Sequence, residues 1–333
     1  MRAATRWATL TASALIAVTA TVAHSTEVWV GNQRTSTVQV IDGESFALIA
    51  EIEVGQKPHN VVFSKNGEAA YVANLRSGTF SVVYPDARRA ITTVAAGKVT
   101  HHVAVSPDDR WLVVAVRGED RVIVYDAGSL QPVKSIPMGK NPGMTVFTPD
   151  GTKAYVNNAG EASLSIIDVG RFEVVGRILD VGGWTSALAI TPDGKRLIVT
   201  AGAGDTYALI DTGTDRVVAS GSSGKSPHGV ALTPDGAHAL VVNSLSNDLS
   251  VIDMSTGTVV ETIAEIGDKP AFVDVSPDGR YAFVTLIGER AAGDPPNRLS
   301  GHSPGLAVVD LVQKKVVHTV PPGGDPPSVT VRR

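Results

Sequence analysis

Short apolar runs alternate with polar turns along most of the chain, and the runs have the two-residue alternation of strands rather than a helical period. Residues 148–158, TPDGTKAYVNN, are one example, because a Pro-Asp-Gly turn favours a tight reversal and a β-rich run follows it. The turn recurs at six places, which begin at Ser64, Ser106, Thr148, Thr191, Thr233 and Ser276. The intervals are 42, 42, 43, 42 and 43 residues, so the chain is an array of repeats.

Each repeat has room for four strands. A short strand precedes the turn, the β-rich run follows it, a third run usually ends in Asp, and a fourth leads to the next repeat. Four strands in about 42 residues are typical of one blade of a β-propeller. The acids that end the third strands can accept backbone N–H groups in the following turn, so we interpret them as structural: Asp42, Asp126, Asp168, Asp211, Asp253 and Asp310.

The two ends of the chain complement each other. After residue 25 the sequence supplies strands two to four of a blade without a first strand, and DPPSVTVRR at residues 325–333 supplies a first strand without partners. We therefore predict that the C-terminal strand completes the N-terminal blade and closes the ring, which removes exposed sheet edges. The predicted fold is an all-β, seven-bladed β-propeller with four antiparallel strands per blade, formed by residues 26–333 as a single domain.

Several segments copy one repeat motif closely: AYVAN at residues 70–74, AYVNN at 154–158 and LVVN at 240–243, each after a Ser/Thr turn and before a strand that ends in Asp or Tyr. In these segments the chain resembles the YVTN-type β-propeller repeat family, over nearly all of residues 26–333. The resemblance implies an exported seven-bladed propeller with a binding, surface-layer or quinoprotein-associated role, and related propellers include lactonases. Because the motif residues are turn and core positions, the resemblance implies a fold and no single activity.

Residues 1–25 have the features of a secretory signal peptide. MRAATR carries two arginines and no acid, and the residues that follow are small and apolar. A cut after Ser25 satisfies the small-residue rule, and a cut after Ala23 is nearly as good. The alternative is an uncleaved anchor, but the run is interrupted by threonines and is shorter than the ~20 apolar residues of a spanning helix. We predict a periplasmic or secreted protein with no membrane span after cleavage.

Composition narrows the chemistry and the partners. The chain has no cysteine, so disulfides, thiol catalysis and thiolate metal sites are excluded. Its formal net charge is −4, and cleavage after Ser25 would remove Arg2 and Arg6 and leave −6. An acidic chain does not favour nucleic acid. We expect a monomer whose partner is a small anionic ligand or a periplasmic protein.

The loops between consecutive blades carry the candidate binding residues. In a propeller these loops lie on one face, around the mouth of the central channel. Three of them have a histidine at an equivalent position, and five have a lysine nearby: His59, His101 and His228, with Lys57, Lys98, Lys140, Lys225 and Lys269. We predict a basic ring that binds an anion or an acidic surface and that the histidines make pH-dependent. The alternative is that the lysines only keep the turns soluble. The spacing of the histidines does not favour a metal site.

Three features depart from the repeat. Residues 286–305 form a loop about 14 residues longer than its counterparts, with Arg290 and His302, which we expect to cover the channel or dock a partner, unless the loop is a tolerated insertion. Asp274 is an acid in a first strand where other repeats have Val, Ala or Thr, and it is either a satisfied structural acid or a weak catalytic candidate. Trp184 lies at the predicted channel mouth, where it would stack on a ring-shaped ligand or plug the channel.

Three functions fit these observations, and we favour the first. It is a non-enzymatic binding or scaffold protein that recognises a small anionic ligand or a protein partner at the channel mouth, because the repeats keep nearly identical loops. The second is a lactonase-like hydrolase or lyase with Asp274 and the histidines as acid/base groups. The third is a periplasmic accessory protein of a quinone- or haem-dependent oxidation system, in which Trp184 and the lysines hold the anionic cofactor. The first two hypotheses require no cofactor or metal.

Overall fold

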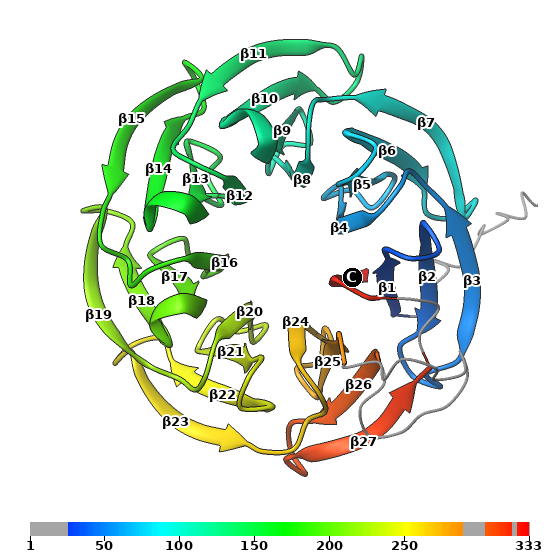
Figure 1. Ribbon diagram of the computed structural model, residues 1–333, viewed down its shortest axis with the longest axis vertical. Helices are drawn as coiled ribbons and strands as arrows, with labels where there is room; N and C mark the ends of the chain where they lie inside the picture. Colours follow the sequence, from blue (N-terminus) through cyan, green and yellow to red (C-terminus); the bar gives the residue numbers. More distant parts are fainter. Residues whose placement is uncertain (1–25, 289–303, 322–324, 333) are drawn as a thin grey trace, which may run out of the picture.

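The computed structural model describes residues 26–288, 304–321 and 325–332. Its strands form seven four-stranded antiparallel sheets, which are arranged as blades around a central axis (Figure 1). The predicted all-β, seven-bladed propeller is therefore confirmed. Blades 1 to 6 each take four consecutive strands from β4 onwards, and blade 7 consists of β28 and β1 to β3.

The two inner strands of each blade are nearest to the axis. The first strands of blades 1 to 7 are β4 (Pro58–Phe63), β8 (Thr100–Val105), β12 (Pro142–Phe147), β16 (Thr185–Ile190), β20 (Pro227–Leu232), β24 (Pro270–Val275) and β28 (Ser328–Arg332). The second strands are β5 (Ala70–Asn74), β9 (Trp111–Val116), β13 (Lys153–Asn158), β17 (Arg196–Ala201), β21 (His238–Asn243), β25 (Tyr281–Leu286) and β1 (Glu27–Asn32).

The two outer strands of each blade complete the sheets. The third strands are β6 (Thr79–Tyr84), β10 (Arg121–Asp126), β14 (Ser163–Asp168), β18 (Thr206–Asp211), β22 (Asp248–Asp253), β26 (Gly305–Asp310) and β2 (Thr37–Asp42). The fourth strands are β7 (Arg89–Ala95), β11 (Pro132–Pro137), β15 (Glu173–Ile178), β19 (Arg216–Ser222), β23 (Thr258–Ile263), β27 (Lys315–Val320) and β3 (Leu48–Glu53). Three short 3₁₀ helices follow second strands: η1 (Arg117–Glu119), η2 (Ala159–Glu161) and η3 (Gly202–Gly204). None of the helices in the described ranges is long and apolar enough to cross a membrane.

The hydrophobic core lies in layers between neighbouring blades. Leu240 of blade 5, for example, shares one buried cluster with Val275 and Val284 of blade 6. The second and third strands are buried on both faces because each blade is covered by two others. Fourth strands such as β15 and β23 instead alternate between exposed and partly buried positions, because they form the outer rim (Figure 1).

The recurrent turns are held by their own side chains. The Thr148 hydroxyl donates to the Asp150 carboxylate (2.6 Å) and accepts the N–H of Lys153 (3.0 Å). Gly151 has φ +71°, a left-handed conformation that glycine adopts without steric cost. The acids that end the third strands accept N–H groups of the following turn in all six cases, from Ser45, Ser129, Arg171, Thr214, Thr256 and Gln313. The structural interpretation of these six acids is confirmed.

The ring is closed as predicted. The last strand, β28, pairs with β1 in antiparallel register, with Trp29 opposite Thr330, and Figure 1 shows the C-terminus beside β1. Val329 and Val331 of β28 pack with Val28 and Val30 of β1 in one buried cluster that also includes residues of blade 6. The N-terminal blade therefore receives its innermost strand from the other end of the chain.

A hydrogen bond from a side chain of one blade to the main chain of an innermost strand crosses every junction between neighbouring blades. From blade 1 round to blade 7 and back to blade 1, the pairs are Asn60 with Val103, His102 with Thr145, Asn157 with Thr185, Thr200 with His228, His228 with Ala271, Asp274 with Val331, and Thr330 with Val61. These bonds satisfy main-chain groups that the innermost strands leave unpaired along the axis.

Truncation of the closing strand's core is the direct test of ring closure. Val331 is 4% exposed, so Val331→Ala should lower the free energy of unfolding by about 2 kcal/mol, because it removes buried methyl groups and leaves a cavity. Val312→Ala, at a position that is 77% exposed, is the control and should change it by less than about 0.5 kcal/mol. Urea denaturation measures both variants. Equal effects would show that β28 contributes little to stability.

Candidate functional site

Two sets of loops lie on one face of the ring, as predicted. In each blade the loop that leads into the first strand is bonded to the loop that follows the second strand. The N–H of Leu75 donates to the carbonyl of Lys57 (2.8 Å), and the N–H of Arg117 donates to that of Val99 (3.0 Å). Equivalent bonds join Ala159 to Asn141, Gly202 to Trp184, Ser244 to Ser226 and Ile287 to Lys269. We call this side of the ring the mouth face.

The predicted histidines occupy one structural position. The register between the first two strands shifts at Pro58 to Asn60, at Thr100 to His102 and at Pro227 to Val230, which are β-bulges at the mouth end of β4, β8 and β20. His59, His101 and His228 each lie within such a bulge. A bulge redirects a side chain that regular pleating would place between two sheets. The equivalence inferred from the sequence therefore has a geometric basis.

His101 and His102 are buried, and His59, His228 and Phe272 are half-buried beside them. The rings of His59 and His101 lie 3.9 Å apart between centroids, and the His101 side chain is 5% exposed. Phe272 of blade 6 contacts His59 edge-to-face at 6.2 Å and His228 at 4.9 Å, so it links blade 1 to blade 5 across the axis. A cavity of about 90 Å³ borders this group, lined in part by His59, His101, His102 and Phe272.

Burial keeps these histidines neutral. Loss of solvation, followed by the charge of Arg117, lowers the pKa of His59 and of His102 to about 3. Loss of solvation also lowers the pKa of His228, and it places that of His101 well below its ordinary value. The histidines therefore add no positive charge to the mouth face at neutral pH, and any pH dependence that they confer lies in the acid range.

Hydrogen bonds assign the neutral forms of two of the rings. His102 Nδ1 accepts the N–H of Thr145 (3.4 Å), so its hydrogen is on Nε2. His228 Nδ1 lies 2.9 Å from the carbonyl of Ala271, which can only accept, so Nδ1 carries the hydrogen and Nε2 is an acceptor. His59 Nδ1 and His101 Nδ1 are buried without a protein partner. The group therefore offers both donors and acceptors of hydrogen bonds.

Arg117 is the functional candidate that the sequence analysis missed. It follows β9 at the mouth face, and its Nε is buried without a hydrogen-bond partner. Its nearest neighbours include Gly143, where an added Cβ would lie 3.0 Å from the Arg117 Nη2 and 2.6 Å from the Asn157 Oδ1. Loss of solvation lowers the pKa of Arg117 to about 10, so the guanidinium stays charged at neutral pH. Asn157 Oδ1 is likewise buried without a partner.

Arg117 could have been identified from the sequence as a departure from the repeat. The equivalent positions of the other blades, identified by their backbone bonds, are Leu75, Ala159, Gly202, Ser244, Ile287 and Gln33. Blade 2 is thus alone in placing a charge there. Within the described residues, no group of three or more His, Asp or Glu side chains is arranged to hold a metal ion.

The predicted lysines lie on the mouth face but do not form a uniform ring. Lys57, Lys98, Lys140 and Lys225 are exposed, and Lys269 is half-buried. Lys225 is paired with Asp205 at 2.8 Å. The sector over blades 1 and 2 therefore retains more uncompensated positive charge than the sector over blades 4 and 5.

The remaining candidates lie in different environments. Trp184 is 50% exposed on the mouth face of blade 4, so its ring is accessible to solvent. Asp274 accepts the N–H groups of Val275 and Val331, both at 2.8 Å, and these bonds account for a carboxylate within a strand. Arg290 and His302 lie outside the described residues.

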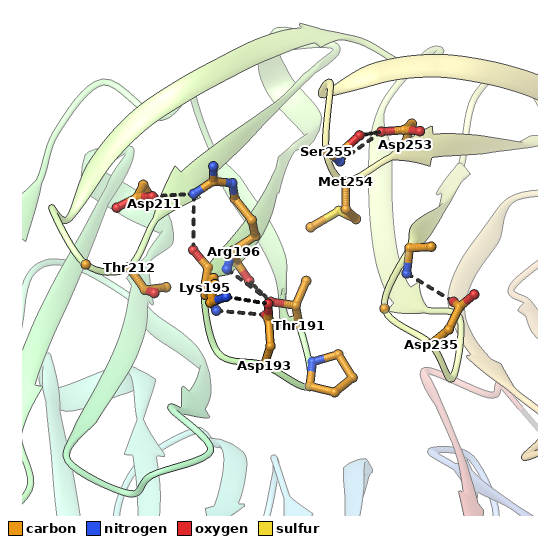
Figure 2. Close-up of a pocket in the computed structure, with 14 residues that line it drawn as sticks. Thr191, Asp193, Lys195, Arg196, Asp211, Thr212, Asp235, Asp253, Met254 and Ser255 are labelled. Atoms are coloured by element: carbon orange, nitrogen blue, oxygen red, sulfur yellow. Dashed lines mark hydrogen bonds and ion pairs between the residues drawn. The ribbon is translucent and has the colours of Figure 1, made fainter.

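A larger pocket opens on the opposite face, between blades 4 and 5. It measures about 770 Å³ and is lined by the turns that carry Asp193, Asp211, Asp235 and Asp253 (Figure 2). Each carboxylate is already bonded, to Thr191, to Arg196, to the N–H of Ala237 and to Ser255, respectively. The pocket is therefore spacious, but its acids are engaged in structural contacts.

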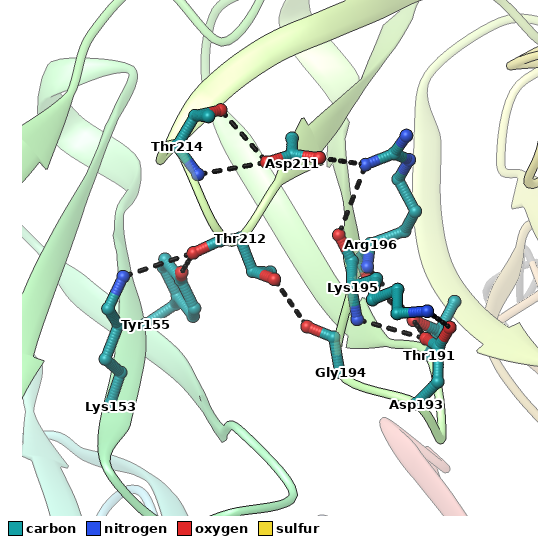
Figure 3. A network of polar contacts seen from close by, with 10 residues as sticks. All are labelled: Lys153, Tyr155, Thr191, Asp193, Gly194, Lys195, Arg196, Asp211, Thr212 and Thr214. Atoms are coloured by element: carbon teal, nitrogen blue, oxygen red, sulfur yellow. Dashed lines mark hydrogen bonds and ion pairs between the residues drawn. The ribbon is translucent and has the colours of Figure 1, made fainter.

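The same face carries a network that joins blades 3 and 4. Lys153 donates to the carbonyl of Thr212 (3.1 Å), and the Thr212 hydroxyl donates to that of Gly194 (2.5 Å) (Figure 3). Arg196 bridges Asp211 and the carbonyl of Lys195 in the same view. Because its members bond mainly to one another and to main-chain carbonyls, this network explains packing between blades 3 and 4.

The fold and its axial site define a seven-bladed β-propeller with a polar channel mouth. A family model described as YNCE-like β-propeller matches residues 89–235, from β7 to the turn after β20. This match supports a β-propeller family and does not confirm the narrower YVTN-type resemblance. A comparison with curated proteins gave no match.

Three examples illustrate the many solved structures that share the fold. Hydrazine synthase of Kuenenia stuttgartiensis is 21% identical with a TM-score of 0.71, covering 85% of this chain and 91% of that one. A functionally unknown protein of Desulfotomaculum acetoxidans is 13% identical with a TM-score of 0.78, covering 92% and 98%. Dihydro-heme d1 dehydrogenase NirN, in complex with DHE, is 17% identical with a TM-score of 0.64, covering 91% and 74%. At these identities the likeness establishes the fold alone.

The lowered histidine pKa values predict a loss of stability in acid. The unfolded chain takes up a proton on each histidine below pH 6.5, whereas folded His59 and His102 stay neutral until about pH 3. The free energy of unfolding should therefore fall as the pH decreases from 6.5 towards 3, by up to about 1.4 kcal/mol per pH unit for each buried histidine.

Urea denaturation at pH 7, 6 and 5 measures this slope. His59→Gln should make the slope shallower than in the wild type, whatever its effect on absolute stability. His318→Gln, at an exposed position of β27, is the control for replacing a histidine. An unchanged slope in His59→Gln would contradict the burial of a neutral ring at residue 59.

Proposed function

We propose that the chain is an exported binding protein that holds a small anionic group at the channel mouth through Arg117. The observation that carries the proposal is the guanidinium itself, which is half-buried, has a fully buried Nε without a hydrogen-bond partner, and has no carboxylate partner in the described ranges. A buried charge without a counter-charge is costly, and a bound anion offsets that cost. Guanidinium groups suit carboxylate and phosphate because their donors match both geometries.

The surrounding groups support a small ligand. Neutral His59, His101 and His102 solvate an anion by hydrogen bonding without competing for a counter-ion of their own. The bordering cavity of about 90 Å³ is well below the roughly 300 Å³ of sites for drug-sized molecules. The site therefore suits a carboxylate, a phosphate or the acidic end of a longer molecule whose remainder stays on the mouth face.

The observations do not favour the hydrolase or lyase alternative. Both oxygens of Asp274 accept main-chain N–H groups, so the carboxylate is committed to the junction between blades 6 and 7. General acid/base catalysis needs a group within hydrogen-bond reach of the substrate. The proposal is therefore a binding function without turnover.

The accessory role in a haem- or quinone-dependent system has one comparison behind it, because NirN is described in complex with DHE. The cavity beside the histidines does not enclose a macrocycle at about 90 Å³. Arg117 would instead meet an acidic substituent of such a group. A visible absorption band in protein isolated from its native host would favour this alternative over a colourless small anion.

Small-anion binding is measured by isothermal titration calorimetry with acetate and with inorganic phosphate, in Tris chloride buffer. Arg117→Met should weaken binding of the preferred anion by at least about tenfold, because it removes the charge-assisted hydrogen bonds. Lys195→Met, on the opposite face, is the control and should leave binding unchanged. Absence of binding of both anions to the wild type would overturn the proposal.

The same variant distinguishes a ligand-binding arginine from a structural one. Without added anion, Arg117→Met should keep or raise the free energy of unfolding, by on the order of 1 kcal/mol, because it removes an uncompensated buried charge. A loss of 2 kcal/mol or more would instead mean that Arg117 stabilises the fold through contacts with the protein.

Export is tested separately, because residues 1–25 lie outside the described residues. We expect the protein in the periplasmic fraction or the medium. Its mass should be that of a chain whose first residue is Thr26 or His24. Cytoplasmic protein that retains residues 1–25 would contradict export. That result would not bear on the proposed anion site.

A further inference from the structure

An open groove lies on the mouth face between blades 1 and 2. It measures about 480 Å³ and is lined by Lys57, Leu75, Arg76, Lys98 and Val99. These residues come from the loops that lead into β4 and β8 and from the loop after β5, and β4 and β8 are neighbours in the ring (Figure 1). The groove is separate from the buried histidine group, although the same two loops run on to His59 and His101.

The groove is electropositive, because three of its five lining residues are basic and none is acidic. Lys57, Arg76 and Lys98 are exposed, and none of them forms an ion pair within the described part of the chain. The adjacent carboxylate of Glu119 is engaged by Arg121 at 2.6 Å and by the main-chain N–H of Lys98 at 2.8 Å. Its remaining capacity to neutralise the three cations is therefore small.

Main-chain hydrogen bonds hold the loops that present these cations. Lys57 and Val99 have φ values of 54° and 59°, and their carbonyls accept the N–H groups of Leu75 and Arg117. Each side chain is thus displayed from a turn that is bonded to its own blade. Between the cations, Leu75 is partly buried and Val99 is 39% exposed, so the floor offers apolar contact.

We infer that this groove docks an acidic segment of a protein partner beside the channel mouth. Three exposed cations on a net acidic protein make a local field that attracts and orients an acidic surface. The groove is open and shallow, which suits an extended peptide segment with alternating carboxylates better than an enclosed small molecule. The inference needs the groove alone and does not depend on Arg117 binding an anion.

The test uses fluorescence anisotropy with the full mature protein and two labelled decapeptides, (Glu-Ser)₅ and (Gln-Ser)₅. The acidic peptide should bind and the neutral one should not, and binding should weaken by about tenfold or more between 20 and 200 mM NaCl. Combining Lys57→Gln, Arg76→Gln and Lys98→Gln should weaken binding of the acidic peptide by at least about tenfold.

A matched triple variant controls for net charge. Lys65→Gln, Lys134→Gln and Arg216→Gln remove three exposed cations away from the groove and should leave peptide binding unchanged. Equal losses in the two triple variants would show a non-specific charge effect and overturn the inference, as would a wild type that binds neither peptide. Tighter binding of a single-stranded DNA decamer than of (Glu-Ser)₅ would assign the groove to nucleic acid and also overturn it.

Arg117→Met separates this inference from the proposed anion site. Peptide binding should survive Arg117→Met, and phosphate or acetate binding should survive the groove triple variant. Loss of peptide binding in Arg117→Met, with the groove variant unaffected, would show that the peptide is held by a single carboxylate at the channel and not by the groove.

Discussion

Antiparallel pairing of β28 with β1 converts a linear array of blades into a ring, and the other features of the molecule depend on it. Without it, blade 7 would lack its innermost strand, and the buried cluster that blade 7 shares with blade 6 would lose Val329 and Val331. The pairing also brings Asp274 to Val331 and Thr330 to Val61, which are the last two bonds in the series that crosses all junctions. The layers of core between blades are therefore continuous around the axis.

Closure also creates the site. Seven first strands converge on the axis, and bulges at the mouth ends of β4, β8 and β20 direct the histidine side chains inwards. There the low-polarity surroundings disfavour charge, which is why four histidines lie together as neutral rings. Arg117 resists deprotonation because guanidinium is so basic, and it keeps its positive charge beside these neutral rings. A neutral polar shell around one cation is a chemical basis for recognising an anion.

The fold could be predicted from the sequence because the same strand and turn pattern is repeated along the chain. A period of 42 or 43 residues, a turn of fixed composition and an unpaired strand at each end leave few arrangements other than a closed ring. The equivalence of His59, His101 and His228 was accessible for the same reason. The extent of their burial could not be predicted, because it depends on packing between blades that are distant in sequence. Phe272 of blade 6, for example, packs against His59 and His228. Arg117 was overlooked because repeats draw attention to shared residues, whereas it occurs once.

The closing pair has a consequence for the order of events in folding. Arg332 and Glu27, which meet across this sheet, are 305 residues apart in the chain. Contacts of such long sequence separation carry the largest loop-closure entropy and form slowly. Blades 1 to 6 can assemble from strands that are consecutive in the chain, whereas blade 7 is complete only when β28 pairs with β1. Closure of the ring is therefore expected to be the last step of folding, which can occur only after both ends of the chain are available.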